Sequence, residues 1–212
     1  MMDRLATNRG RNDDEPNIEL AVDIARRGDA AAVAELVGGM SGKDAAIASD
    51  CVKALYETGY REPRLLAGHA PAFVTALRSR NNRLVWGGMI ALGTLAPVSP
   101  DEVYAGIDVI LRSFERGSVI TVDAGVRVLA GLSAANGEYA RRLVPVLLSH
   151  LETCRPKDVA QHAESAAVCM TGERAAAFAR VLEARRSDLT PAQAKRVDKV
   201  LGAGNAARRR AP

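Results

Sequence analysis

A repeat with a period of 37 residues organises this chain. The stretch Leu84–Glu115 aligns with Thr121–Glu152 at that offset, and residues of the same apolar or small type coincide. The coinciding pairs include Val85 with Val122, Gly88 with Gly125, Leu92 with Leu129, Leu95 with Leu132 and Ile110 with Leu147. The same step backwards finds two further copies, at Ala70–Leu77 and Val33–Met40. A fixed period between about 20 and 50 residues is typical of stacked repeat proteins.

Each copy contains two amphipathic helices. The first carries apolar residues at i, i+3, i+4 and i+7, as in Ile107, Ile110, Leu111 and Phe114. The second also keeps its apolar and small residues on one helical face, as in Leu84, Gly88, Ala91, Leu92 and Leu95. Neither helix can bury its apolar stripe alone, so the pairs must stack on one another. The sequence therefore predicts an all-α solenoid.

The run Trp86-Gly-Gly-Met-Ile-Ala-Leu-Gly-Thr-Leu95 resembles the second helix of the HEAT-repeat family, which reads like V-R-x-x-A-x-x-A-L-G-x-L. Within Trp86–Leu95, the residues that match its end are Ala91, Leu92, Gly93 and Leu95, and Pro145 matches a proline common in the first helix. The chain departs from the family at Asn82, where an aspartate is usual, and at Val85 and Val122, where an arginine is usual. The resemblance covers roughly residues 29 to 201. It implies a right-handed solenoid of about five HEAT-like helix pairs.

The repeat register also predicts the domain organisation. Residues 1–16 are polar and contain Gly10 and Pro16, so we expect a flexible N-terminal segment. Residues 17–201 form a single HEAT-like repeat domain, with Asn17 as the expected cap of its first helix. In residues 202–212, Gly202-Ala-Gly204 is expected to end the last helix and leave a basic flexible tail.

Composition and charge narrow the classes of function. The chain has 212 residues, of which 48% are hydrophobic and only 4% aromatic, so aromatic platforms for stacking bases are scarce. The net charge is +4, but Arg208, Arg209 and Arg210 supply +3 of it, residues 1–16 supply −1, and the repeats keep only +2. Nucleic acid is therefore an unlikely partner of the repeats. No apolar stretch suits a membrane span or a signal peptide, so a cytoplasmic location is expected.

Cysteine and histidine spacing predicts no metal site and no cofactor. Cys51, Cys154 and Cys169 have no C-x-x-C spacing and are expected to be reduced thiols in the core. His150 and His162 could join Cys154 and Cys169 as four zinc ligands, but their spacing matches no zinc motif.

The candidate site follows from the family resemblance, which implies that the second helices line the concave surface. Positions outside the core stripe should then form ladders at the 37-residue step. The predicted partner-binding residues are Lys53, Tyr56, Trp86, Ile90, Asp123, Arg127 and Glu164. Trp86 is the only tryptophan, and it either anchors a partner or packs between repeats. The mixed charges favour a protein or peptide partner over a polyanion.

No nucleophile–base arrangement, metalloprotease motif or phosphate-binding glycine loop occurs in the sequence. One enzymatic alternative comes from bacterial alkylpurine DNA glycosylases of HEAT-like architecture, which use a Trp, an Asp and an Arg on the concave face. Trp86 and Arg127 could take two of these roles, but Ile90 stands where the acid is expected. We therefore predict a non-enzymatic interaction module or scaffold. The alternatives are a HEAT-like DNA-binding or glycosylase-type protein and an accessory subunit of a larger assembly.

Overall fold

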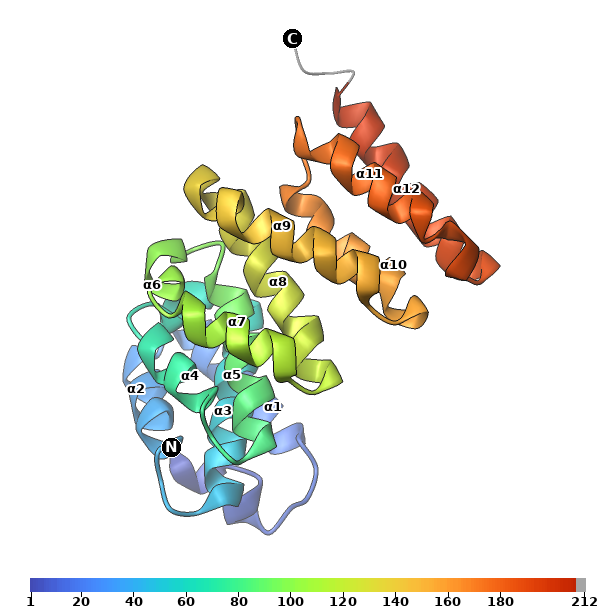
Figure 1. The fold of residues 1–212 in the computed structure, drawn as a ribbon. Helices are drawn as coiled ribbons and strands as arrows, with labels where there is room; N and C mark the ends of the chain where they lie inside the picture. The colour runs from blue at the N-terminus through green and yellow to red at the C-terminus, as the bar shows by residue number, and fades with distance from the viewer. Residues whose placement is uncertain (209–212) are drawn as a thin grey trace. The chain divides into compact units, whose positions relative to one another are not determined.

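The computed structural model describes residues 1–208, with side chains described as far as Gly202. This part of the chain contains helices and no strand, which confirms the all-α prediction (Figure 1). The α-helices are α1 (Glu15–Arg27), α2 (Ala30–Gly39), α3 (Ala45–Arg61), α4 (Ala70–Ala76), α5 (Asn82–Leu95), α6 (Pro100–Tyr104), α7 (Ile107–Arg116), α8 (Val119–Ala135), α9 (Gly137–Thr153), α10 (Pro156–Ala166), α11 (Arg174–Ala184) and α12 (Pro191–Arg208). Short 3-10 helices are η1 (Met2–Arg4), η2 (Thr7–Arg9), η3 (Pro63–Leu66), η4 (Ala167–Cys169) and η5 (Arg186–Asp188). None of the helices described combines the length and the hydropathy of a membrane span.

The helices divide into two compact units. The single HEAT-like repeat domain over residues 17–201 stays a prediction. The first unit is Met1–Val128 and the second begins at Leu129, so the boundary lies inside α8. The predicted helix pairs are present as α2 with α3, α4 with α5, α7 with α8, α9 with α10, and α11 with α12.

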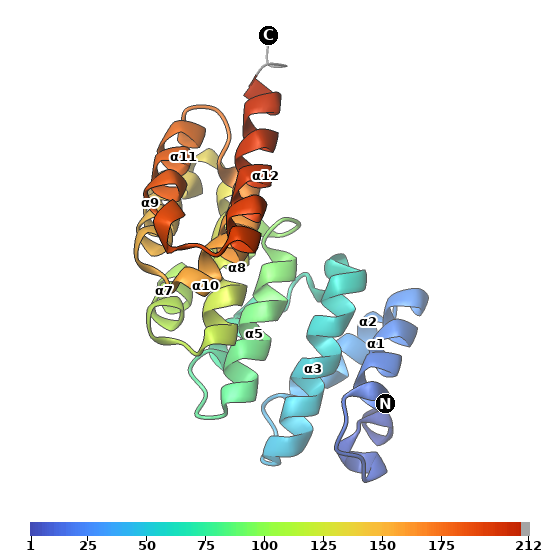
Figure 2. The same ribbon diagram turned by 90° about the vertical axis from the view of Figure 1, so that its right-hand side faces the viewer.

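In the first unit, α3 packs against α1, α2 and α5, and Figure 2 shows α1, α3 and α5 side by side. Leu55 of α3 and Leu92 of α5 are fully buried in the core between these helices, and Phe73 of α4 is fully buried as well. Local signals set the helix starts, because the side chains of Asp29, Asp44 and Asn81 accept hydrogen bonds from the first-turn amides of α2, α3 and α5. In the second unit, α9 packs against α11, and α10 packs against α12.

Two repeats contain a third, short helix that the two-helix prediction omits. The 3-10 helix η3 precedes α4, and α6 precedes α7. Both short helices begin at a proline, Pro63 or Pro100, where the fixed φ suits a first helical turn. Each ends at a turn before the next helix, and Gly68 makes the first of these turns with φ of 84°. Repeats of three helices distinguish one class of α-solenoid from the two-helix HEAT class.

The N-terminal segment is packed against the first unit, contrary to the expectation of a flexible segment over residues 1–16. Leu5 is fully buried and the backbone forms the short helices η1 and η2. Asn17 is fully buried and does not cap α1, which begins at Glu15. Its side chain instead accepts a hydrogen bond from the Ala6 amide at 3.0 Å and donates one to Asp50 at 2.8 Å. The Asp50 carboxylate also accepts a hydrogen bond from the Thr7 amide at 2.7 Å.

The C-terminal end also differs from the sequence prediction. Helix α12 does not end at Gly202-Ala-Gly204 but continues to Arg208. Glycines in a helix interior cost about 1 kcal/mol each and do not by themselves stop a helix. The rest of the predicted basic tail, residues 209–212, lies outside the described residues.

A matched pair of glycine substitutions tests the close packing of α3 and α5. A Cβ atom on Gly87 would lie 2.8 Å from both Cγ atoms of Val52, a β-branched side chain with little freedom to move. We expect Gly87→Ala to destabilise the fold by about 1–3 kcal/mol because it overpacks this contact. A Cβ atom on Gly38, in α2, would meet no other atom within 4 Å, so Gly38→Ala should stabilise by about 0.4–1 kcal/mol. Urea unfolding measures both, and equal effects would contradict the close approach.

A second substitution tests the anchoring of the N-terminal segment. Asn17→Ala removes one partner of the Asp50 carboxylate and of the Ala6 amide, so we expect a loss of about 1–3 kcal/mol. Amide hydrogen exchange should show residues 1–9 becoming less protected in this variant. Asn12→Ala, at an exposed position, is the control and should change neither quantity. Unchanged protection in Asn17→Ala would show that the buried network does not hold the segment.

Candidate functional site

Three aromatic rings from two neighbouring helices form a contiguous group in the first unit. The rings of Tyr56, on α3, and Trp86, on α5, have centroids 6.0 Å apart with an interplanar angle of 57°. Tyr60 lies one turn after Tyr56 and meets it edge to face, at 6.0 Å and 78°. Such pairs contribute about 0.5–1.5 kcal/mol beyond their buried area. We call Tyr60, Tyr56 and Trp86 the aromatic ladder.

The three rings differ in exposure, so they differ in the surface area that they offer to a partner. Tyr56 is only 6% exposed, so it supports its neighbours and offers almost no area to a partner. Trp86 is half-buried, and Tyr60 is 50% exposed. Both outcomes considered for Trp86 therefore apply in part, since its ring packs between repeats and also reaches the surface.

Lys53 contacts both the aromatic ladder and a network of charged side chains on α3. Its ammonium lies 4.8 Å from the centroid of the Tyr56 ring, within cation–π range. It also pairs with Glu57 at 2.9 Å and with Asp14 at 3.4 Å. Burial alone would lower the pKa of Lys53, but hydrogen bonds to Tyr56 and Glu57 outweigh it and raise this pKa. Lys53 is thus a charged, internally paired group.

Glu57 is the acid at the centre of this network. It accepts hydrogen bonds from Lys53 and from Arg61, the latter at 2.7 Å. Burial alone would raise the pKa of Glu57, but these two cations outweigh burial and lower it. The network fixes the side chains on this face of α3 and so orders the base of the ladder.

A pocket of about 250 Å³ lies beside the ladder, between α3, α5 and α8. Its lining includes Tyr60 of α3, Ile90 of α5 and Arg127 of α8, and the remaining lining residues are small or apolar: Gly59, Pro63, Gly93, Thr94, Pro97 and Ala124. Arg127 is exposed and its Nη1 donates a hydrogen bond to the Tyr60 hydroxyl at 3.4 Å. The pocket can accept an apolar side chain and offers a cation at its rim.

The structure brings together most of the predicted partner-binding residues of the first unit. Lys53, Tyr56 and Trp86 form one group, and Ile90 and Arg127 line the pocket beside it. Asp123 is half-buried on α8, one turn before Arg127. Glu164 belongs to the second unit, where its carboxylate pairs with Arg196 of α12 at 2.6 Å. The binding role of all seven residues remains a prediction.

The sequence interpretation missed Tyr60, the most exposed ring of the ladder. Tyr60 falls outside the 37-residue ladders, but its i, i+4 spacing from Tyr56 places both on one face of α3, which is the signal that could have identified it.

A second pocket was also missed. It has a volume of about 320 Å³ and is lined by three exposed arginines, Arg78, Arg112 and Arg116, together with residues at the start of α8.

The cysteines agree only in part with the expectation of reduced core thiols. All three are free, and Cys51 and Cys169 are buried. Burial raises the pKa of Cys51 to about 12 and that of Cys169 to about 11, so both stay protonated at neutral pH. Cys154 is only half-buried and lies with His150 and His162 in the second unit.

Comparisons with known proteins place the chain at the level of fold. No protein family matches the sequence, and no curated protein matches it. Among solved structures, a designed armadillo repeat protein in complex with the peptide (KR)4 is similar, with a TM-score of 0.72, 14% identity and coverage of 90% of each chain. A computationally designed armadillo repeat protein for modular peptide recognition has a TM-score of 0.65 and 16% identity, and the match covers 89% of this chain and 92% of that one. The chain therefore has an armadillo-type α-solenoid fold, and HEAT membership is not confirmed.

Proposed function

We propose that this chain is a non-enzymatic module that binds a peptide segment of a partner protein on α3, α5 and α8. The observation that carries the proposal is that the side chains of Trp86, Tyr60 and Ile90 reach the surface beside the pocket. We call these three residues the ledge. Tryptophan, tyrosine and arginine dominate the energetics of protein interfaces, and all three occur here. The armadillo-type fold supports the proposal because its designed relatives recognise peptides.

The chemistry of the ledge indicates the kind of segment that fits. An apolar side chain would enter the pocket between Tyr60 and Ile90, and an adjacent carboxylate would meet the exposed Arg127. Lys53 already pairs with Glu57 and Asp14, so it serves to order Tyr56 more than to attract a ligand. These contacts hold Tyr56 in place before a partner binds. The entropy cost of ordering side chains on binding is therefore small.

The alternative of a DNA glycosylase-type enzyme lacks its acid in this geometry. Ile90, at the position where that acid is expected, forms an apolar wall of the pocket. An aliphatic side chain cannot stabilise the positive charge that develops on a sugar during base excision. The geometry therefore favours binding over catalysis.

Peptide display measures the proposed binding directly. A random peptide library is selected on the purified chain, and selected peptides are titrated while the fluorescence of Trp86, the only tryptophan, is recorded. We expect Trp86→Ala, measured by calorimetry, to weaken binding by about 2 kcal/mol, or roughly 30-fold, because it removes an anchor from the ledge. Tyr60→Ala should weaken binding in the same direction.

Val168→Ala is the control, since Val168 is an exposed apolar residue of the second unit and should not affect binding. Ile90→Asp separates the two interpretations of the pocket. At a peptide surface it places a charge in an apolar contact and weakens binding, whereas in a degenerate glycosylase site it restores an acid without harm to DNA binding. Selected peptides that bind Trp86→Ala as tightly as the parent would contradict the proposed site.

The three-arginine pocket favours a second candidate function, contact with a nucleic acid backbone. Arg78, Arg112 and Arg116 concentrate positive charge in one part of a body that is otherwise nearly neutral. Phosphate contacts by arginine would make such binding steeply dependent on salt.

Substitution of one pocket arginine tests this candidate. If the pocket contacts phosphates, Arg112→Ala should reduce the slope of log K against log salt for duplex DNA by about 1. Arg180→Ala, at an exposed position on α11, is the control and should leave the slope unchanged. If Arg112→Ala binds DNA as well as the parent chain and deletion of residues 202–212 abolishes binding, the C-terminal end and not the pocket binds DNA.

A further inference from the structure

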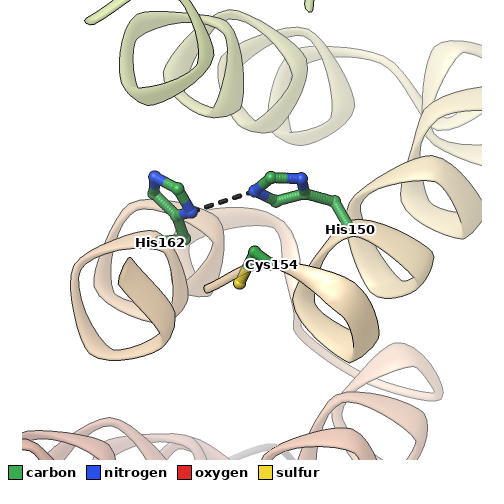
Figure 3. A group of neighbouring side chains, drawn as sticks. All are labelled: His150, Cys154 and His162. Atoms are coloured by element: carbon green, nitrogen blue, oxygen red, sulfur yellow. Dashed lines mark hydrogen bonds between the residues drawn. The ribbon is translucent and has the colours of Figure 1, made fainter. Parts of the chain in front are cut away.

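Two histidines and a cysteine meet at the corner between α9 and α10. His150 lies in the last turn of α9, Cys154 follows as its C-terminal cap residue, and His162 lies on α10. One potential ligand atom from each residue lies within 4.8 Å of the other two. Figure 3 shows the two imidazole rings edge to edge, with one nitrogen of each ring joined by a hydrogen bond, and Cys154 beside them.

We propose that His150, Cys154 and His162 form a binding site for Zn²⁺, with a fourth position open to water. Imidazole nitrogen and thiolate sulfur are the ligands that zinc prefers, whereas Mg²⁺ and Ca²⁺ prefer oxygen. Three protein ligands with an open fourth position is an established zinc arrangement. The proposal departs from the sequence-based expectation of no metal site, and it is independent of the peptide ledge.

The local fold brings the three side chains together. His150 and Cys154 are four residues apart, so they project from the same side of the end of α9. Arg155 and Pro156 then reverse the chain into α10, whose second turn places His162 against them. His162 is only 1% exposed, whereas His150 and Cys154 are half-buried. His162 is thus held in the interior, and a metal ion could reach the site from the side of the partly exposed His150 and Cys154.

Arg185 fixes the backbone at this corner. Its guanidinium donates hydrogen bonds to the carbonyl of Leu151 at 2.6 Å and to the carbonyl of Cys154 at 2.8 Å. These bonds satisfy carbonyls at the C-terminal end of α9, where helices leave acceptors unpaired. The position of the Cys154 side chain is therefore set by the fold before any metal binds.

The imidazole pair is close to the geometry that zinc requires. His150 Nε2 and His162 Nδ1 lie 2.9 Å apart and share a hydrogen bond. Two nitrogens that bind one zinc ion at about 2.0–2.1 Å lie about 3.3 Å apart in a tetrahedral site. Only a small separation of the two rings is needed for a metal ion to replace the shared hydrogen.

Metal binding has a defined proton balance. A ring nitrogen that binds the metal carries no hydrogen, so the hydrogen shared by the two rings must leave the space between them. The thiol must lose its proton, because the thiolate is the metal ligand. Burial raises the pKa of Cys154, and the nearby Arg185 acts in the opposite direction. Zinc binding should therefore release at least the thiol proton at neutral pH.

Cobalt titration of the reduced, metal-free full chain tests the site. Co²⁺ substitutes for zinc and reports a thiolate ligand by a charge-transfer band in the near ultraviolet. We expect one equivalent to produce this band, and Zn²⁺ to displace it. Cys154→Ser should abolish the band, and His162→Asn should weaken binding by more than about tenfold, since loss of a supporting partner alone costs 10–100-fold.

Cys169→Ser is the matched control, because Cys169 is a thiol of the same unit outside the cluster, with its sulfur directed to the carbonyl of Ala166 at 3.2 Å. This variant should keep the band, and zinc should raise its melting temperature as it does that of the parent. Circular dichroism verifies that the variants fold. The absence of a thiolate band in the parent chain, or an equal band in Cys154→Ser, would overturn the proposal.

Discussion

The close contact between α3 and α5 is the constraint on which the first unit depends. Gly87 faces Val52 across this contact with no room for a Cβ atom, so the two helices approach more closely than larger residues would allow. Trp86 directly precedes Gly87 on α5. The short distance between the two helices brings the Trp86 ring centroid to 6.0 Å from that of Tyr56 on α3. The same packing that buries the core stripe therefore also builds the aromatic ladder.

The repeat period accounts for the part of the fold that the sequence predicts well. Apolar residues 37 positions apart fall on equivalent helices, and Leu92 and Leu129 are both fully buried. The period carries no information about segments that are held by single polar contacts. The hydrogen bond of Asn17 to Asp50 joins residues 33 positions apart, and the positions 37 residues after them hold Ala54 and Gly87, so the period does not encode it. Composition alone therefore predicts a flexible segment over residues 1–16.

The same distinction explains the candidate site. Lys53, Trp86, Ile90 and Arg127 lie at positions defined by the repeat, and the structure places them on or beside one ledge. The repeat does not determine how deeply a side chain is covered, so the burial of Tyr56 was not predictable from its position. The cluster of His150, Cys154 and His162 depends on the single turn between α9 and α10, which the 37-residue period does not encode.

The distribution of the scarce aromatic residues supports the binding role proposed for the ledge. The three phenylalanines, Phe73, Phe114 and Phe178, are all buried in the cores of their units. The single tryptophan, which is half-buried, and Tyr60, which is half exposed, instead reach one surface, where both pack against the buried Tyr56. Exposure of such rings loses part of the free energy that full burial would supply. Amphipathic rings kept at a surface, beside a pocket and over a fixed charge network, have the properties of a preformed binding surface.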